Sequence, residues 1–164
     1  MNSSDYLKDQ YPKAVSVYPK ELSDYFKGDY LFLSDYTPIL KSFGKILLQV
    51  DDEDYSGDSR VLYEFPDGTY GYLQFGWGSC SGCDALQACD NPEEVEDLID
   101  MLQASIKHFD SAEEGLKYFL EHDWEGDYSW HCKEQKEFIE HSIELFKDII
   151  KYNREQKKCW QKYE

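Results

Sequence analysis

Apolar residues cluster in three short runs in the middle of the chain, and each run predicts a β-strand. The runs are rich in β-branched and aromatic residues and cover positions 46–50, 60–65 and 69–75. The last two runs are joined by Pro66-Asp67-Gly68, whose residue types favour a tight turn, so we expect a hairpin. Between the first two runs, segment 51–58 is so acidic and Gly-punctuated that it predicts a fully exposed loop.

The second half of the chain has the spacing of amphipathic helices. Asn91, Pro92 and Glu94 stand in the order of a capped helix start, and an apolar stripe follows at Val95, Leu98, Ile99, Leu102 and Ile106. Ser111 and Glu114 repeat the capping pattern ahead of a second apolar segment, Leu116 to Leu120. A third helix is expected from about Lys133, with a tail from Arg154 onward that is polar enough to fray.

Strands first and helices afterward predict an α+β fold. We expect a small antiparallel sheet of about three or four strands, packed on one face by three to five helices, with a helical C-terminal half. The length of 164 residues suits a single domain over 1–164. Its predicted parts are an N-terminal helical or extension segment at 1–44, with two short helices between Ser4 and Lys27, a β-rich part at 45–77, a cysteine cluster at 78–90 and a helical part at 91–158.

The net charge of −17 is unevenly distributed. Residues 133–164 carry a net +1, so residues 1–132 carry −18. Such a surface repels nucleic acid and anionic lipid and attracts basic clefts of the kind that hold DNA or RNA. We therefore expect neither direct nucleic-acid binding nor membrane binding, and we expect a protein partner with a basic nucleic-acid-binding cleft.

The chain shows no membrane-spanning or secretory pattern. No apolar run approaches the roughly 18 residues of a transmembrane helix, and the first residues lack the plan of a signal peptide, so a cytoplasmic location is expected. Five cysteines in a reducing compartment argue against a disulfide framework.

The cysteine segment 78–90 is where residue types suggest chemistry. Cys80 and Cys83 have the two-residue spacing that can present two sulfurs to one tetrahedral cation, and Cys89 offers a third. His131 or Cys132 would supply a fourth ligand, which makes zinc the candidate cofactor. Two alternatives stay open: reactive thiols at the start of a helix from Asp84, whose charge opposes such activation, and plain burial of small apolar side chains.

Three acidic clusters are candidates for partner binding. Carboxylates at helical spacing can imitate a row of phosphates, and neighbouring aromatic rings can anchor the contact. The alternative is that these acids only keep a Tyr-rich protein dissolved, although −18 exceeds the roughly 2 to 8 charges that a small domain needs. The candidate residues are Asp51, Asp52, Glu53, Asp54, Glu93, Glu94, Glu96, Asp97, Asp123, Trp124, Glu125, Asp127 and Tyr128.

Segment 70–84, which begins Tyr-Gly-Tyr-Leu-Gln-Phe-Gly-Trp and ends in Gly-Ser-Cys-Ser-Gly-Cys-Asp, resembles a family of small acidic proteins of bacteriophages and bacterial genomes. Phe109-Asp110-Ser111 and Trp130-His131 extend the resemblance over roughly 45–150. A phage setting implies, by analogy of charge alone, an inhibitor of host nucleases.

The sequence thus predicts binding rather than catalysis. We expect a phage-type acidic inhibitor that imitates DNA and occupies the basic surface of a host defence nuclease, in the manner of anti-CRISPR or anti-restriction proteins. A zinc- or thiol-dependent module centred on Cys80, Cys83 and Cys89 is one alternative, and a structural or assembly protein with incidental acidity is the other.

Overall fold

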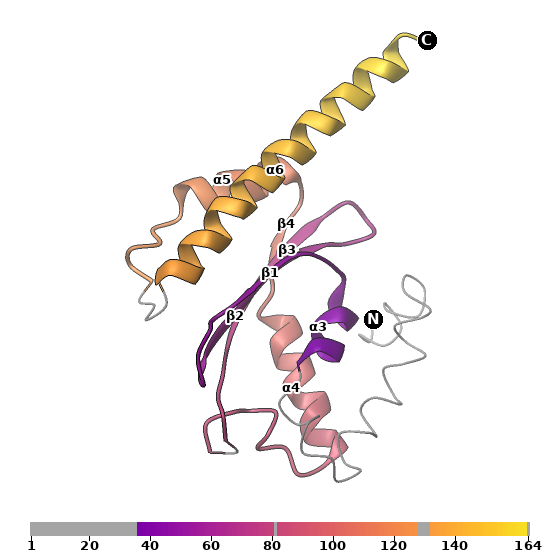
Figure 1. Cartoon of the computed structure of the whole chain (residues 1–164). Helices are drawn as coiled ribbons and strands as arrows, with labels where there is room; N and C mark the ends of the chain where they lie inside the picture. The colour runs from indigo at the N-terminus through magenta and orange to yellow at the C-terminus, as the bar shows by residue number, and fades with distance from the viewer. Residues whose placement is uncertain (1–35, 81, 128–131, 164) are drawn as a thin grey trace.

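The computed structural model describes residues 36–80, 82–127 and 132–163. In these ranges the chain forms one four-stranded antiparallel sheet in the order β1-β2-β3-β4, together with four helices (Figure 1). The predicted α+β class and the helical C-terminal half are confirmed. The elements are α3 (Thr37–Phe43), β1 (Lys45–Asp51), β2 (Gly57–Glu64), β3 (Tyr70–Trp77), α4 (Pro92–Ala104), β4 (Lys107–Phe109), α5 (Ala112–Glu121) and α6 (Cys132–Gln161).

The three predicted strands are β1, β2 and β3, and the predicted hairpin joins β2 to β3. Its turn is closed by the Gly68 N–H donating to the Phe65 carbonyl at 3.0 Å, and Gly68 takes the positive φ of 82° that favours glycine. The fourth strand, β4, pairs its three residues with the start of β3 and lies inside the range 91–158 that was predicted to be helical. The two helices predicted between Ser4 and Lys27 lie outside the described residues.

Helices cover both faces of the sheet, so the prediction of a single covered face is wrong. Val61, Tyr63, Leu73 and Phe75 pack against α3 and α4, in a cluster that also holds the apolar side of α4. The intervening residues Leu62, Tyr70 and Tyr72 pack on the other side, against α5 and α6. Successive strand residues point to opposite faces, and burying both faces explains why Val61, Leu62 and Tyr63 are all fully buried.

The two predicted capping motifs are present and similar. In α4 the Asn91 side chain accepts from the Glu94 N–H at 2.9 Å, and the Glu94 carboxylate accepts from the Asp90 N–H at 2.6 Å. In α5, Ser111 and Glu114 make the same pair of bonds, with Glu114 accepting from the Asp110 N–H. Each motif satisfies backbone donors that a helix start leaves unpaired.

Helix α6 packs on the sheet only through its first two-thirds. Its last buried residue is Ile150, and residues 151–163 are all exposed, where the helix projects away from the domain (Figure 1). In the structure the helix continues through the segment that was predicted to fray and ends at Gln161. The segment is rich in Lys, Arg, Gln and Glu, which have high helix propensity. Among the described residues, no helix combines the length and apolarity needed to cross a bilayer.

The contact between α5 and α6 depends on a glycine. A Cβ built on Gly115 would collide with the Phe146 ring, which is itself fully buried against Tyr70, Phe109 and Phe119. We expect Gly115→Ala to lower the free energy of unfolding by up to about 2 kcal/mol, because an overpacking cost of about 1–3 kcal/mol exceeds the roughly 1 kcal/mol gained in helix propensity. Urea denaturation measures the change, and a more stable variant would contradict this packing.

Candidate functional site

The outer side of α4 carries a row of carboxylates. Val95, Leu98, Ile99 and Leu102 face the core, so the helical period turns the remaining positions outward. Side chains three or four positions apart on a helix are neighbours, about 5–6 Å apart at Cβ. We define the α4 acidic face as four exposed residues at this spacing: Glu93, Glu96, Asp97 and Asp100.

The α4 acidic face lies in a stretch of sequence without positive charge. Residues 61–106 include nine Asp and Glu but no Lys, Arg or His. Within the part of the chain that the structure describes, no Lys or Arg side chain forms an ion pair with these carboxylates. The predicted residue Glu94 differs from its neighbours, because its carboxylate is engaged in capping α4. Met101 follows Asp100 directly in the chain, is 55% exposed and offers a large apolar contact beside the face.

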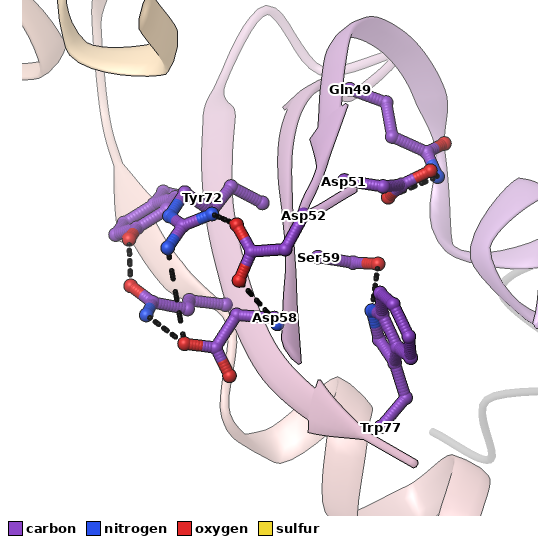
Figure 2. Close-up of polar contacts among 9 residues, drawn as sticks. Gln49, Asp51, Asp52, Asp58, Ser59, Tyr72 and Trp77 are labelled. Carbon is purple, nitrogen blue, oxygen red and sulfur yellow. Dashed lines mark hydrogen bonds and ion pairs between the residues drawn. The ribbon is translucent and has the colours of Figure 1, made fainter. Parts of the chain in front are cut away.

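The first predicted cluster, at 51–54, is divided between surface and interior. Asp51, Glu53 and Asp54 are exposed, but Asp52 is only 4% exposed, so the prediction of a fully exposed segment is wrong. The Asp52 carboxylate accepts from the Arg60 guanidinium at 2.7 Å and from the Asp58 N–H at 2.7 Å (Figure 2). Arg60 is itself fully buried, so Asp52 has a structural partner and is not presented to another protein.

Around Arg60 the polar contacts continue toward Tyr72, which belongs to the core cluster on the α5 and α6 side of the sheet, here called the second core cluster. Asp58 lies 3.9 Å from the Arg60 guanidinium and accepts from the Gln74 amide at 3.1 Å. The Tyr72 hydroxyl donates to the Gln74 side-chain oxygen at 2.6 Å (Figure 2). Burial raises the pKa of Tyr72, which keeps this hydroxyl protonated as a donor.

The third predicted cluster, at 123–128, is described up to Asp127 and lies on the opposite face of the sheet from α4. Trp124 is half-buried in the second core cluster, stacks on Phe119 and donates to the Phe119 carbonyl at 2.9 Å. Asp127 contacts His122 at 2.6 Å, and Asp123 accepts from the Gly126 N–H. Asp123, Glu125 and Asp127 are exposed, while Tyr128 lies outside the described residues. The sheet therefore separates this cluster from α4, and the predicted anchor Trp124 is mainly a packing residue.

The cysteine segment forms a turn between β3 and α4. The Cys83 N–H donates to the Cys80 carbonyl at 3.0 Å, and the two Sγ atoms lie 2.7 Å apart, both exposed. The Cys80 N–H also donates to the Cys83 Sγ at 3.0 Å. The hydrogen bond from the Cys80 thiol, followed by those from the Cys80 and Ser79 backbone, lowers the pKa of the Cys83 thiol.

Asp84 fastens this turn to the core. Its carboxylate is buried and accepts from the N–H groups of Gly78, Leu86 and Gln87 at 2.9–3.0 Å and from the Tyr36 hydroxyl at 3.2 Å. The predicted helix from Asp84 is absent, since residues 85–88 form only turns. A helix N-terminus therefore does not lower the thiol pKa here, and the donors to Cys83 come from within its own turn.

The predicted zinc ligands are only partly brought together. In the ranges that the structure describes, no three His, Cys, Asp or Glu side chains form a metal-binding group. Cys89 is half-buried, and its thiol donates to the Ala85 carbonyl. Cys132 begins α6, which packs on the opposite face of the sheet, and His131 lies outside the described residues. Two sulfurs on one tetrahedral zinc would be about 3.8 Å apart, whereas the Cys80 and Cys83 Sγ atoms are 2.7 Å apart. Zinc binding therefore stays a prediction.

A basic groove that belongs to none of the predicted sites lies between α5 and α6. It encloses about 600 Å³ and has an apolar floor of Leu116, Leu120 and Ile150. Its cationic rim is made by Lys117, Lys147, Lys151, Arg154 and Lys158, with Glu113, Glu121 and Glu155 among them. The only signal in the sequence was the net +1 of residues 133–164, which gave no indication that the cations would gather along one helix.

Comparison of the chain with protein-family models, with curated proteins and with solved structures gives no match in any of the three, so the residues themselves carry the functional argument.

Proposed function

We propose that the protein is a phage-type acidic inhibitor whose α4 acidic face occupies a basic, nucleic-acid-binding surface of a host defence nuclease. The observation that carries the proposal is the row of Glu93, Glu96, Asp97 and Asp100, exposed and without ion-pair partners among the described residues. A carboxylate row of this kind gives a basic groove the charge pattern of a nucleic-acid backbone, whose phosphates advance by about 3.4 Å along one strand.

The α4 acidic face favours electrostatic attraction of a partner over burial of an aromatic anchor in it. Opposite charges steer two surfaces together and make association fast and salt-sensitive. The predicted aromatic anchor Trp124 lies on the other face of the sheet, and Met101 is the large apolar side chain next to the acidic row. We therefore place recognition on α4 and leave Asp52 and Glu94 out of it, since both have structural partners.

Charge neutralisation with matched geometry tests the proposal. We expect E93Q/E96Q/D97N/D100N to weaken partner binding by at least about tenfold, because four surface contacts of about 0.5 kcal/mol each sum to about 2 kcal/mol. The readout is capture of nucleases from a bacterial lysate, followed by affinity measurement and inhibition of DNA cleavage with the captured enzyme. Excess duplex DNA and high salt are both expected to displace the partner.

The control is a variant that loses the same total charge elsewhere. E53Q/E121Q/E125Q/E144Q neutralises four exposed carboxylates that lie outside α4. It is expected to bind like the unmodified protein, so a loss specific to the α4 variant separates a recognition surface from a general need for negative charge. Equal capture by both variants, or capture that duplex DNA does not compete with, would overturn the proposal.

A further inference from the structure

The Cys80–Cys83 turn has no part in the proposed binding surface, yet it holds two exposed thiols in contact. The Sγ atoms are 2.7 Å apart, and the S–S bond of a disulfide is about 2.05 Å long. Converting the dithiol to the disulfide therefore requires the two sulfur atoms to approach by well under 1 Å. The turn that sets this distance is closed by the Cys83 N–H bond to Cys80 and is anchored by Asp84 through Gly78.

The turn directs a backbone donor at the Cys83 sulfur, which suits that sulfur to attack a disulfide. The Cys83 Sγ accepts from the Cys80 N–H at 3.0 Å, contacts the Cys80 thiol, and as a protonated thiol donates to the Cys80 carbonyl at 3.3 Å. The Asp84 carboxylate, which from sequence opposes such activation, is directed into the core, where it accepts from Gly78, Leu86, Gln87 and Tyr36. Burial raises the pKa of the Cys89 thiol, and Cys89 is half-buried where Cys83 is exposed.

We propose that Cys80 and Cys83 form a redox-active pair that exchanges with low-molecular-weight disulfides of the glutathione disulfide class. The Cys83 thiolate attacks one sulfur of the external disulfide, which forms a mixed disulfide and releases one thiolate. The Cys80 thiol gives its proton to that thiolate, and the Cys80 sulfur then attacks the Cys83 sulfur and displaces the second external sulfur as a thiolate, which takes up from solvent the proton that Cys83 released on ionising. The two protein thiols are oxidised to one disulfide, and the external disulfide is reduced to two thiols.

The contact between the two sulfurs predicts a specific product. In a variant that keeps only these two cysteines, C89S/C132S/C159S, glutathione disulfide is expected to yield protein lighter by two hydrogen atoms and free of glutathione. Acid quenching, alkylation and mass spectrometry identify this product, and dithiothreitol is expected to restore both thiols. The thermal melting curve of the reduced variant reports whether the fold is intact.

Single-cysteine variants assign the roles and supply the control. With Cys80 also replaced by Ser, glutathione is expected to stay attached to Cys83; with Cys83 replaced instead, the adduct at Cys80 is expected to form several-fold more slowly. A chain that keeps only the exposed Cys159 is expected to form an adduct at a slower rate than Cys83. Glutathione left on both Cys80 and Cys83, no reaction at either, or zinc held by both thiols against the reagent would overturn the proposal. None of these readouts depends on the α4 acidic face.

Discussion

Replacing Arg60 with methionine is expected to lower the free energy of unfolding by about 3–5 kcal/mol. Arg60 is fully buried, and its guanidinium contacts the Asp52 carboxylate at 2.7 Å and lies 3.9 Å from that of Asp58. Removing the cation takes the Arg60 guanidinium away from the buried Asp52 carboxylate, and breaking a buried ion pair from one side is strongly destabilising. Urea denaturation followed by tryptophan fluorescence measures the loss.

A second substitution distinguishes charge from packing. In R60M/D52N the remaining partner is neutral, and its amide oxygen still accepts from the Asp58 N–H, so we expect the double variant to recover a large part of the loss. A double variant no more stable than R60M would show that the guanidinium acts through packing alone. A loss below about 1 kcal/mol in R60M would show that the pair is not desolvated as its burial implies.

Removal of the Asp84 carboxylate, as in Asp84→Ala, is expected to cost at least about 3 kcal/mol. Three backbone N–H groups and one hydroxyl donate to this buried side chain, and its loss leaves several buried donors without an acceptor, at about 1–3 kcal/mol each. The matched control is Tyr36→Phe, which deletes one of these bonds and a contact to the Leu86 N–H, and is expected to cost about 1 kcal/mol. Equal losses in the two variants would contradict this account.

The local structure could be predicted because neighbouring residues determine it. Turn chemistry at Pro66-Asp67-Gly68 and the capping pairs Asn91–Glu94 and Ser111–Glu114 each operate within a few residues, and all three occur in the structure. The second covered face of the sheet also had a signal. Val61, Leu62 and Tyr63 are consecutive apolar residues, a pattern typical of a strand buried on both sides rather than one.

The tertiary roles of the acids could not be predicted in the same way. In a chain with 34 Asp and Glu, nothing in the residue type separates Asp52 and Asp84, which are buried and bonded, from Glu96 and Asp97, which are exposed. Their partners Arg60 and Tyr36 lie 8 and 48 residues away, and the sheet and the Cys80–Cys83 turn decide those contacts. Strand β4 was missed because three residues, of which only Phe109 is buried, give no period to detect.

The projecting end of α6 is positively charged and α4 is negatively charged, so charge is separated along the molecule. Residues 151–163 carry five Lys and Arg against one Glu, and in Figure 1 they extend from the sheet in the direction away from α4. A body charged in this way experiences a torque in an external field, so a cationic surface would rotate it before collision until α4 leads and the helical arm trails. Encounters would then begin in a narrow range of orientations, and an arm that points outward leaves its exposed Trp160 and Tyr163 clear of that first contact.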